Sequence, residues 1–216
     1  MSARVVSAGA NILVCLALRE EAGAFQRFAG VGTDISILIT GIGRRNAKMA
    51  VEAGLKIRSP RLVLTCGFAG ALNPALVAGD VVFSTDDAGL HQRLLAAGAQ
   101  PARFFCASKI ATTATEKQGL RRTSGADAVE MESEAIHAIC RERRIPCATV
   151  RAISDTANEN LPLDFNRLSN ADLSLNYGKL ALAIAKSPGR IPALLRLQRN
   201  SRFAAGRLAD VLGKIT

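Results

Sequence analysis

Three glutamates alternate in the stretch AVEMESEAI, at Glu130, Glu132 and Glu134, and Asp155 follows the apolar residues 147–153. Carboxyl groups can donate or accept a proton and can stabilise a developing positive charge. If residues 147–153 form a parallel strand, Asp155 lies at its carboxyl end, where α/β proteins bind small ligands. Its position therefore indicates acid–base chemistry on a bound ligand.

A second acidic pair, Glu20 and Glu21, follows another apolar run, residues 12–18. Acids in the first turn of a helix are also expected without any catalytic role, because they interact favourably with the helix dipole. The same explanation is sufficient for Glu134. Both interpretations of Glu21 therefore stay open at this point.

Apolar runs alternate with amphipathic segments along most of the chain. This order predicts one α/β layer structure with a mostly parallel sheet. The predicted strands are residues 12–18, 34–40, 61–66, 81–84, 103–107 and 147–153, and the predicted helices are residues 19–28, 44–57, 112–120, 172–186 and 191–215.

Glycine-rich turns follow two of these strands. Residues 41–43 read Gly-Ile-Gly ahead of Arg44, so backbone N–H groups and a helix N-terminus could bind an anion there. A tight turn followed by solvated arginines explains the pattern equally well. Residues 67–74 are predicted to form a loop of small residues whose N–H groups line a pocket.

Composition limits the class of protein. A chain of 216 residues forms one domain, or one domain with an appendage. The five cysteines form no CxxC pair, which is typical of a reducing compartment, and two histidines are too few for a histidine-rich metal site. The apolar residues 11–18 are followed at once by acids, so they predict a strand and not a signal peptide. No run is long enough to span a membrane.

The basic charge is concentrated at the C-terminus. Of the formal net charge of +10, residues 186–216 contribute +6. Residues 191–215 predict a basic amphipathic helix, which divides the chain into a domain at 1–186 and a C-terminal helix at 187–216. This helix could pack on the domain, pack on a second subunit, or contact anionic lipid. With few aromatic residues and no recognition motif, binding of nucleic acid is not expected.

Several motifs in sequence order resemble a known family. TGIGRRNA, TCGFAGALNPALVAGDVV, AVEMESEAI and VRAISDTANE resemble the purine and uridine phosphorylase superfamily, particularly its methylthioadenosine/S-adenosylhomocysteine nucleosidases, over residues 12–163. The resemblance implies a single-domain, three-layer fold with a mixed, mostly parallel sheet flanked by helices. It also implies cleavage of the N-glycosidic bond of a purine nucleoside, without a cofactor, by a cytoplasmic homo-oligomer.

The resemblance assigns roles to individual residues. Asp155 would protonate the purine, with Ser154 orienting it, and Glu132 would hold the ribose against Met131. Glu21 would activate a water molecule. The remaining expected contacts are Glu130, Gly67, Phe68, Ala69 and Ile110 for the substrate, and Gly43, Arg44 and Arg151 for phosphate or water.

A narrower likeness concerns the substrate. EKQGLRRTSGADAVEMES and SPGRIPALLRLQRNSRFAAGRL resemble the hopanoid-associated phosphorylases, which implies phosphorolysis of an adenosyl-hopane-type lipid nucleoside at the inner face of the membrane, with phosphate as co-substrate. Two residues argue against phosphorolysis. Thr65 stands where purine phosphorylases commonly carry a phosphate-binding arginine, and Glu21, the acid that activates water in the nucleosidases, is present. The alternatives are therefore a hydrolytic nucleosidase and, in another class, a non-catalytic nucleoside-binding protein.

Overall fold

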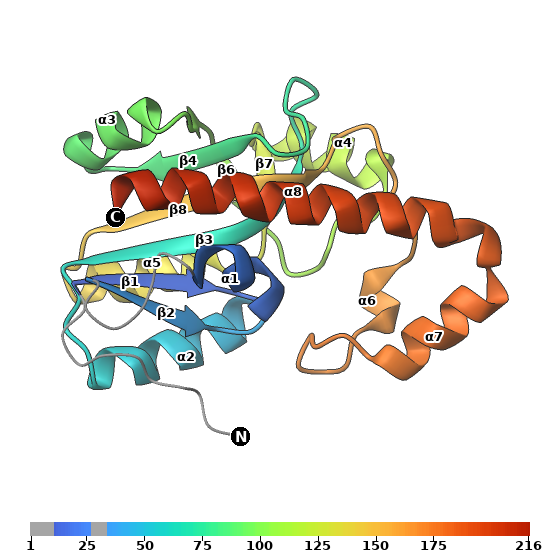
Figure 1. Ribbon diagram of the computed structural model, residues 1–216, viewed down its shortest axis with the longest axis horizontal. Coiled ribbons are helices and arrows are strands. Elements are labelled where there is room, and N and C mark those ends of the chain that lie inside the picture. The colour runs from blue at the N-terminus through green and yellow to red at the C-terminus, as the bar shows by residue number, and fades with distance from the viewer. Residues whose placement is uncertain (1–10, 27–33) are drawn as a thin grey trace.

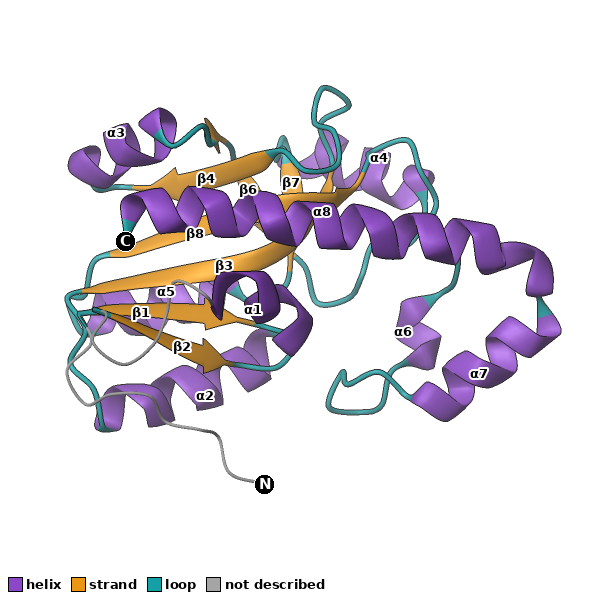
Figure 2. Cartoon of the chain, in the orientation of Figure 1, coloured by secondary structure: helices purple, strands orange, loops and turns teal. Residues whose placement is uncertain are grey.

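A central sheet carries helices on both of its faces (Figure 1). The computed structural model describes residues 11–26 and 34–216. Figure 2 shows how strands and helices alternate along the chain. The strands are β1 (Ile12–Leu16), β2 (Ile35–Ile39), β3 (Leu62–Ala71), β4 (Val81–Thr85), β5 (Gln100–Pro101), β6 (Phe104–Cys106), β7 (Ala128–Glu130) and β8 (Cys147–Asp155).

The helices connect these strands. They are α1 (Arg19–Phe25), α2 (Arg44–Lys56), α3 (Ala88–Ala96), α4 (Ala114–Ser124), α5 (Ser133–Glu142), α6 (Phe165–Leu168), α7 (Tyr177–Lys186) and α8 (Ile191–Ile215), with a 3-10 turn, η2, at Pro188–Arg190. Apolar residues of α2 and α5 pack on one face of β1 and β3, while α1, α3 and α8 cover the opposite face. This arrangement confirms the three-layer α/β fold expected from the sequence.

Strand order in the sheet is β2-β1-β3-β8-β4-β5, and β7 joins β3 to β6. β1 pairs in parallel with β2 and β3, and β3 pairs in parallel with β8. β4 runs antiparallel to β8, and β7 antiparallel to β3. The sheet is therefore mixed and mostly parallel, as predicted.

β3 is longer than the sequence indicated. Residues 67–71 were expected in a loop, but they continue the strand, because β8 supplies ladder partners as far as Asp155 and β7 pairs with Gly70 and Ala71. The prediction of a small-residue loop starting at Gly67 is wrong for these five positions. The three-residue β7, which was not predicted, pairs with the last two residues of this extension.

Helix boundaries differ from prediction in a few places. α4 begins after Thr113, whose hydroxyl accepts from the Glu116 N–H in a capping box. α7 begins at Tyr177 and not at residue 172, because the Asp172 carboxylate accepts from the Ser174 N–H and holds a turn there. The predicted end of the first helix, at residue 28, lies outside the described residues.

The long helix α8 has two different halves. Its C-terminal half is buried, with Ala204, Leu208 and Leu212 at most 1% exposed. Its N-terminal half extends beyond the sheet beside α7, as Figure 1 shows, and Leu195 is 59% exposed. Among the described residues, no helix is both long and apolar enough to cross a membrane.

Candidate active site

A cavity of about 190 Å³ opens near the carboxyl ends of the central strands. Strand ends at this edge of an α/β sheet are where ligands are expected. The cavity brings together most of the residues selected from the sequence, together with apolar neighbours. Its lining is Ala17, Leu18, Glu21, Ile42, Phe68, Ala69, Gly70, Lys109, Ile110, Ala111, Val129, Glu130, Met131, Glu132, Ser154, Asp155 and Leu161.

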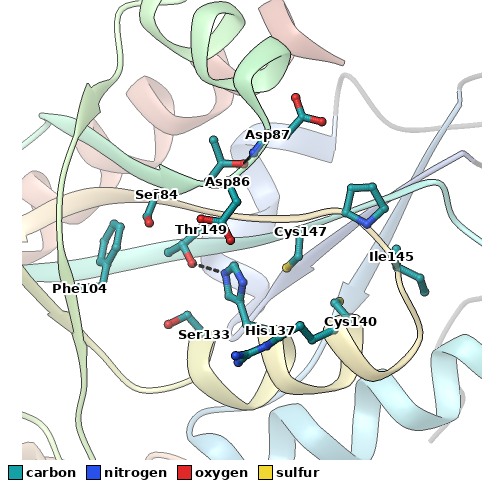
Figure 3. Close-up of a pocket in the computed structure, with 13 residues that line it drawn as sticks. Ser84, Asp86, Asp87, Phe104, Ser133, His137, Cys140, Ile145, Cys147 and Thr149 are labelled. Carbon is teal, nitrogen blue, oxygen red and sulfur yellow. Dashed lines mark hydrogen bonds between the residues drawn. The ribbon is translucent and has the colours of Figure 1, made fainter.

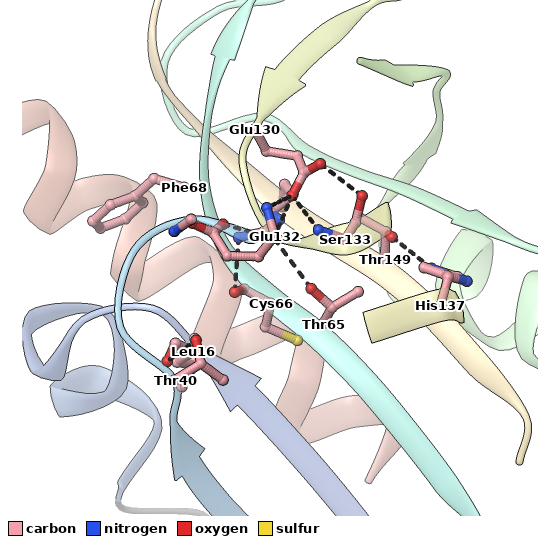
Figure 4. A network of polar contacts seen from close by, with 12 residues as sticks. Leu16, Thr40, Thr65, Cys66, Phe68, Glu130, Glu132, Ser133, His137 and Thr149 are labelled. Carbon is pink, nitrogen blue, oxygen red and sulfur yellow. Dashed lines mark hydrogen bonds and ion pairs between the residues drawn. The ribbon is translucent and has the colours of Figure 1, made fainter. Parts of the chain in front are cut away.

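Arg151 is buried and joins two acidic groups of this cavity, Glu130 and Glu132, whose polar contacts Figure 4 shows. Its Nη2 donates to Glu130 Oε2 at 2.7 Å and to Glu132 Oε2 at 3.3 Å. The same nitrogen also reaches Thr65 Oγ1, and Nη1 donates to the Cys66 carbonyl oxygen. The guanidinium is therefore engaged on both terminal nitrogens, and its positive charge is partly neutralised inside the protein.

Glu130 and Glu132 are both buried, but they differ in electrostatic environment. Burial alone would raise the pKa of Glu130, yet Arg151 and the hydrogen bonds from Ser133 hold that pKa below its ordinary value. For Glu132, burial prevails over the attraction of Arg151, and its pKa is raised. The site therefore contains one firmly ionised carboxylate beside one that binds a proton more readily.

Glu21 lies at the start of α1 and is 4% exposed, whereas Glu20 points outward. The Glu21 carboxylate accepts from the Phe68 N–H at 2.9 Å and from the Leu18 N–H at 2.8 Å. Burial raises its pKa to about 7, although Arg151 opposes the shift. A carboxyl group with such a pKa can act as a base near neutral pH.

Gly67 provides the space between Glu21 and Arg151. A Cβ atom at this position would lie 2.6 Å from Glu21 Oε1 and 2.7 Å from Arg151 Nη1, and the glycine φ is +138°. Only glycine allows the strand to pass this close to both groups. Gly67 itself does not line the cavity, so its contribution is to the placement of the two charged side chains.

Asp155 is the last residue of β8 and is held by two side chains. Ser154 Oγ donates to its Oδ1 at 2.6 Å, and Lys117 Nζ donates to its Oδ2 at 2.5 Å. Lys117, on α4, is fully buried and also donates to the carbonyl oxygens of Thr156 and Glu159. Ser154 was expected from the sequence, but Lys117 was not; it is the one buried residue of a largely polar helix.

The predicted anion site is occupied by the protein's own groups. The Gly43 N–H donates to Glu132 Oε1 at 2.8 Å. Arg44 forms a 2.6 Å ion pair with Glu134 and donates to the Cys106 carbonyl oxygen, away from the cavity lining. Gly43 and Arg151 therefore both donate hydrogen bonds to Glu132, whereas Arg44 lies at the protein surface.

A larger cavity, of about 460 Å³, lies toward the opposite end of β8 (Figure 3). His137 on α5 makes a 2.9 Å hydrogen bond to Thr149 there. None of the residues predicted to act on a ligand lines this cavity. Within the described part of the chain, no cluster of three or more His, Cys, Asp or Glu residues could hold a metal ion. Size alone therefore does not identify the active site.

Comparison with known families decides the classification. The family model of the phosphorylase superfamily matches residues 18–106 and 102–186. The chain belongs to the phosphorylase superfamily. It is 32% identical, over 168 residues, to a 5'-methylthioadenosine/S-adenosylhomocysteine nucleosidase of Glaesserella parasuis serovar 5 (strain SH0165), a match that covers 62% of this chain and 73% of the relative.

Solved structures share the fold of this superfamily member. Futalosine hydrolase of Helicobacter pylori matches with a TM-score of 0.71 and 16% identity, over 96% of this chain and 97% of the other. A 5'-methylthioadenosine/S-adenosylhomocysteine nucleosidase of Neisseria meningitidis, in complex with methylthio-immucillin-A, matches with a TM-score of 0.72 and 18% identity, over 94% and 97% of the two chains. Family membership makes this protein an enzyme that cleaves nucleosides.

Proposed function

We propose that the protein hydrolyses the N-glycosidic bond of an adenine nucleoside. The observation that carries this proposal is the charge of the site. Four carboxyl groups line the cavity, namely Glu21, Glu130, Glu132 and Asp155, and two buried cations, Arg151 and Lys117, lie behind them. A carboxylate that is held ionised beside the sugar, such as Glu130, suits a ribose that becomes cationic in the transition state.

In the proposed reaction, Asp155, a carboxylate in its ion pair with Lys117, takes up a proton from solvent and gives it to N7 of the purine while the bond between C1' and N9 breaks. The electron pair of that bond leaves with the base. Glu132 holds the sugar hydroxyls and, with Glu130, stabilises the positive charge on the ribose. Water then attacks C1', and Glu21 takes the proton that this water loses.

The geometry favours water over phosphate as the nucleophile. A phosphate anion would need free cations or N–H groups, but Arg151 already contacts two carboxylates and the Gly43 N–H already meets Glu132. Residue 65 is a threonine, so no arginine at this position could bind the phosphate. A dianion entering this cavity would meet repulsion from its carboxylates. These observations support the hydrolytic alternative over phosphorolysis, the reaction first expected from the sequence.

Two features suggest the substrate. The relatives named above as nucleosidases act on adenine nucleosides with a 5'-thioether, and their names motivate adenine as the base here. Around the cavity, Leu18, Ile42 and Leu161 provide an apolar lining, and Leu18 is 37% exposed. This lining suits an apolar 5'-group, and it leaves an adenosyl-hopane-type lipid among the candidates.

Product analysis tests this proposal. Adenine, guanine and uracil nucleosides, including 5'-methylthioadenosine and a 5'-alkyl adenosine, are incubated with and without phosphate. Hydrolysis predicts free adenine and free sugar in phosphate-free buffer, and no sugar 1-phosphate when phosphate is added. Adenine release that depends on phosphate would replace hydrolysis by phosphorolysis. Binding without turnover would make the protein a non-catalytic nucleoside-binding protein.

The projecting arm formed by α7 and the first half of α8 supports a second proposal, contact with an anionic lipid surface. Its exposed apolar residues are Tyr177, Leu182, Ile191 and Leu195, and Arg196 and Arg199 are exposed on the same helix, α8. Exposed apolar groups beside basic ones are typical of peripheral membrane helices. A cytoplasmic protein of this kind would attach to the inner face of the membrane.

Vesicle sedimentation tests the arm. The wild type should sediment with vesicles that contain anionic phospholipid and not with neutral ones, and Leu182→Glu/Leu195→Glu should abolish this binding. The lipid proposal is wrong if the wild type sediments with neither vesicle type. If it instead forms a dimer that the same double variant disrupts, the arm is a subunit interface.

A further inference from the structure

Lys117 is the most unusual side chain outside the cavity lining. It is 0% exposed although it lies on α4, a helix made mostly of polar residues. Fully buried lysines are rare and are nearly always paired. This one forms an ion pair with Asp155, 38 positions away in the sequence.

The ammonium group is fully satisfied by three acceptors. Besides Asp155 Oδ2, Nζ donates to the Thr156 carbonyl oxygen at 2.7 Å and to the Glu159 carbonyl oxygen at 3.1 Å. An ammonium has three N–H donors, so none remains for a ligand. Lys117 therefore holds the end of β8 together with the loop that follows it.

The carboxyl group of Asp155 is also fixed from its other sides. Ser154 Oγ donates to Oδ1, and Gly70 lies so close to Oδ2 that a Cβ there would be 3.1 Å away. Asp155 lines the cavity, whereas Lys117 does not. The lysine can therefore affect a bound nucleoside through this aspartate, or through the loop after β8, whose Leu161 lines the cavity.

We infer that Lys117 is a positioning residue that promotes proton transfer from Asp155 to the departing base, an inference that rests on the hydrolysis proposed above. Asp155 first takes up a proton from solvent, and when that proton moves to N7 the carboxylate that pairs with Lys117 forms again at the end of β8. The adjacent ammonium stabilises that carboxylate as it forms, in a buried environment where charge–charge interactions are strong. The proton goes to N7, the C1'–N9 electron pair goes to the base, and Lys117 keeps all of its own protons.

A purely structural lysine would act differently. Holding the loop requires only the two carbonyl contacts, and a buried ion pair is often replaceable by apolar residues without loss of stability. The third contact, to the group proposed to donate the proton, matters only for substrates whose base needs that proton. Substrates with different leaving groups can therefore separate the two roles.

The test compares an adenine nucleoside with its N7-methylated counterpart, whose base leaves as a neutral molecule without protonation. Wild type, Lys117→Met, Asp155→Asn and the control Lys48→Met are assayed on both substrates. Lys48 is an exposed lysine on α2 whose ammonium lies 3.9 Å from the Glu52 carboxylate. Because both rates come from the same preparation, their ratio does not depend on the fraction of protein that is folded.

We expect Lys117→Met to lower kcat for the adenine nucleoside at least about 10-fold and to change KM less than about 3-fold. For the N7-methylated substrate, Lys117→Met should lower kcat by less than about 3-fold. Asp155→Asn should likewise lower kcat more for the adenine nucleoside than for the N7-methylated one. Equal losses on both substrates, or no loss on either, would overturn the positioning role. If the wild type releases no base from either nucleoside, the proposed function fails, and this inference fails with it.

Discussion

The backbone N–H of Gly43 donates to Glu132 Oε1 at 2.8 Å, across 89 positions of sequence. This bond joins the turn between β2 and α2 to the carboxylate at the start of α5. A glycine turn at a helix N-terminus is a common anion site. Here the anion is a side chain of the protein itself, so the turn positions Glu132 and is not free for a phosphate.

Replacing Glu132 tests this relationship. Glu132→Gln should lower kcat/KM by about 100-fold, because the amide cannot stabilise a cationic ribose and leaves Arg151 with one fewer negative partner. Steady-state kinetics on 5'-methylthioadenosine provide the measurement. Glu134→Gln, at an exposed carboxylate beside Arg44, should stay within about 2-fold of the wild type. Similar losses of kcat/KM in Glu132→Gln and Glu134→Gln would contradict the proposed role of Glu132.

The ionisation of Glu21 should control activity near neutral pH. Its pKa is raised to about 7 by burial in the ligand-free protein, and the proposed base must be ionised, so kcat/KM should rise as the pH increases through about 7. Glu21→Gln should lose activity at every pH, while Glu20→Gln, an exposed neighbour, should retain the wild-type profile. A wild-type profile that is flat between pH 5.5 and 8.5 would remove Glu21 from the role of base.

The same shift has a consequence for stability. A carboxyl group whose pKa is higher in the folded than in the unfolded state stabilises the protein below the unfolded pKa. For Glu21, that stabilisation should disappear as the pH rises from about 4.5 to about 7. Thermal unfolding as a function of pH measures it: the Tm of Glu21→Gln relative to wild type should increase over this interval. A constant difference in Tm would show that Glu21 does not titrate there.

Gly67 offers a test of packing at the site. Gly67→Ala should reduce kcat/KM at least about 10-fold and lower stability by about 1–3 kcal/mol, because its Cβ would meet Glu21 and Arg151 at a positive φ. Gly119→Ala is the matched control, since this helical glycine has no atom near a new Cβ. The control should leave activity intact and raise stability by about 0.5–1 kcal/mol. Chemical denaturation and kinetics measure both variants.

The C-terminal half of α8 should contribute strongly to stability. Leu208 is 1% exposed and packs in the core formed with α1 and the sheet, so Leu208→Ala should cost about 2–5 kcal/mol. Leu195→Ala, on the exposed half of the same helix, should change the free energy of unfolding by less than about 0.5 kcal/mol. Equal losses of unfolding free energy from the two substitutions would contradict the burial of the C-terminal half of α8.

Much of the fold could be predicted from local patterns. Apolar runs identified β1, β2 and β8, and the start of α4 was predicted within two residues, because these signals depend on neighbours a few residues away. β7 could not be predicted, since three residues form a strand only when β3 and β6 are already beside them. The extension of β3 beyond Gly67 likewise depends on partners distant in the sequence, β8 and β7.

The sequence by itself determined which residue types the site has available: Asp155 and Glu21 after apolar strands, and the acids of AVEMES. Only the tertiary structure decided how they are used. It turned Glu130 and Glu132 toward Arg151 and Glu134 toward Arg44, and it placed Lys117 behind Asp155. The physical reason for the pairs of Arg151 and Lys117 is that a charge buried far from water needs an opposite partner, and here those partners come from distant parts of the chain.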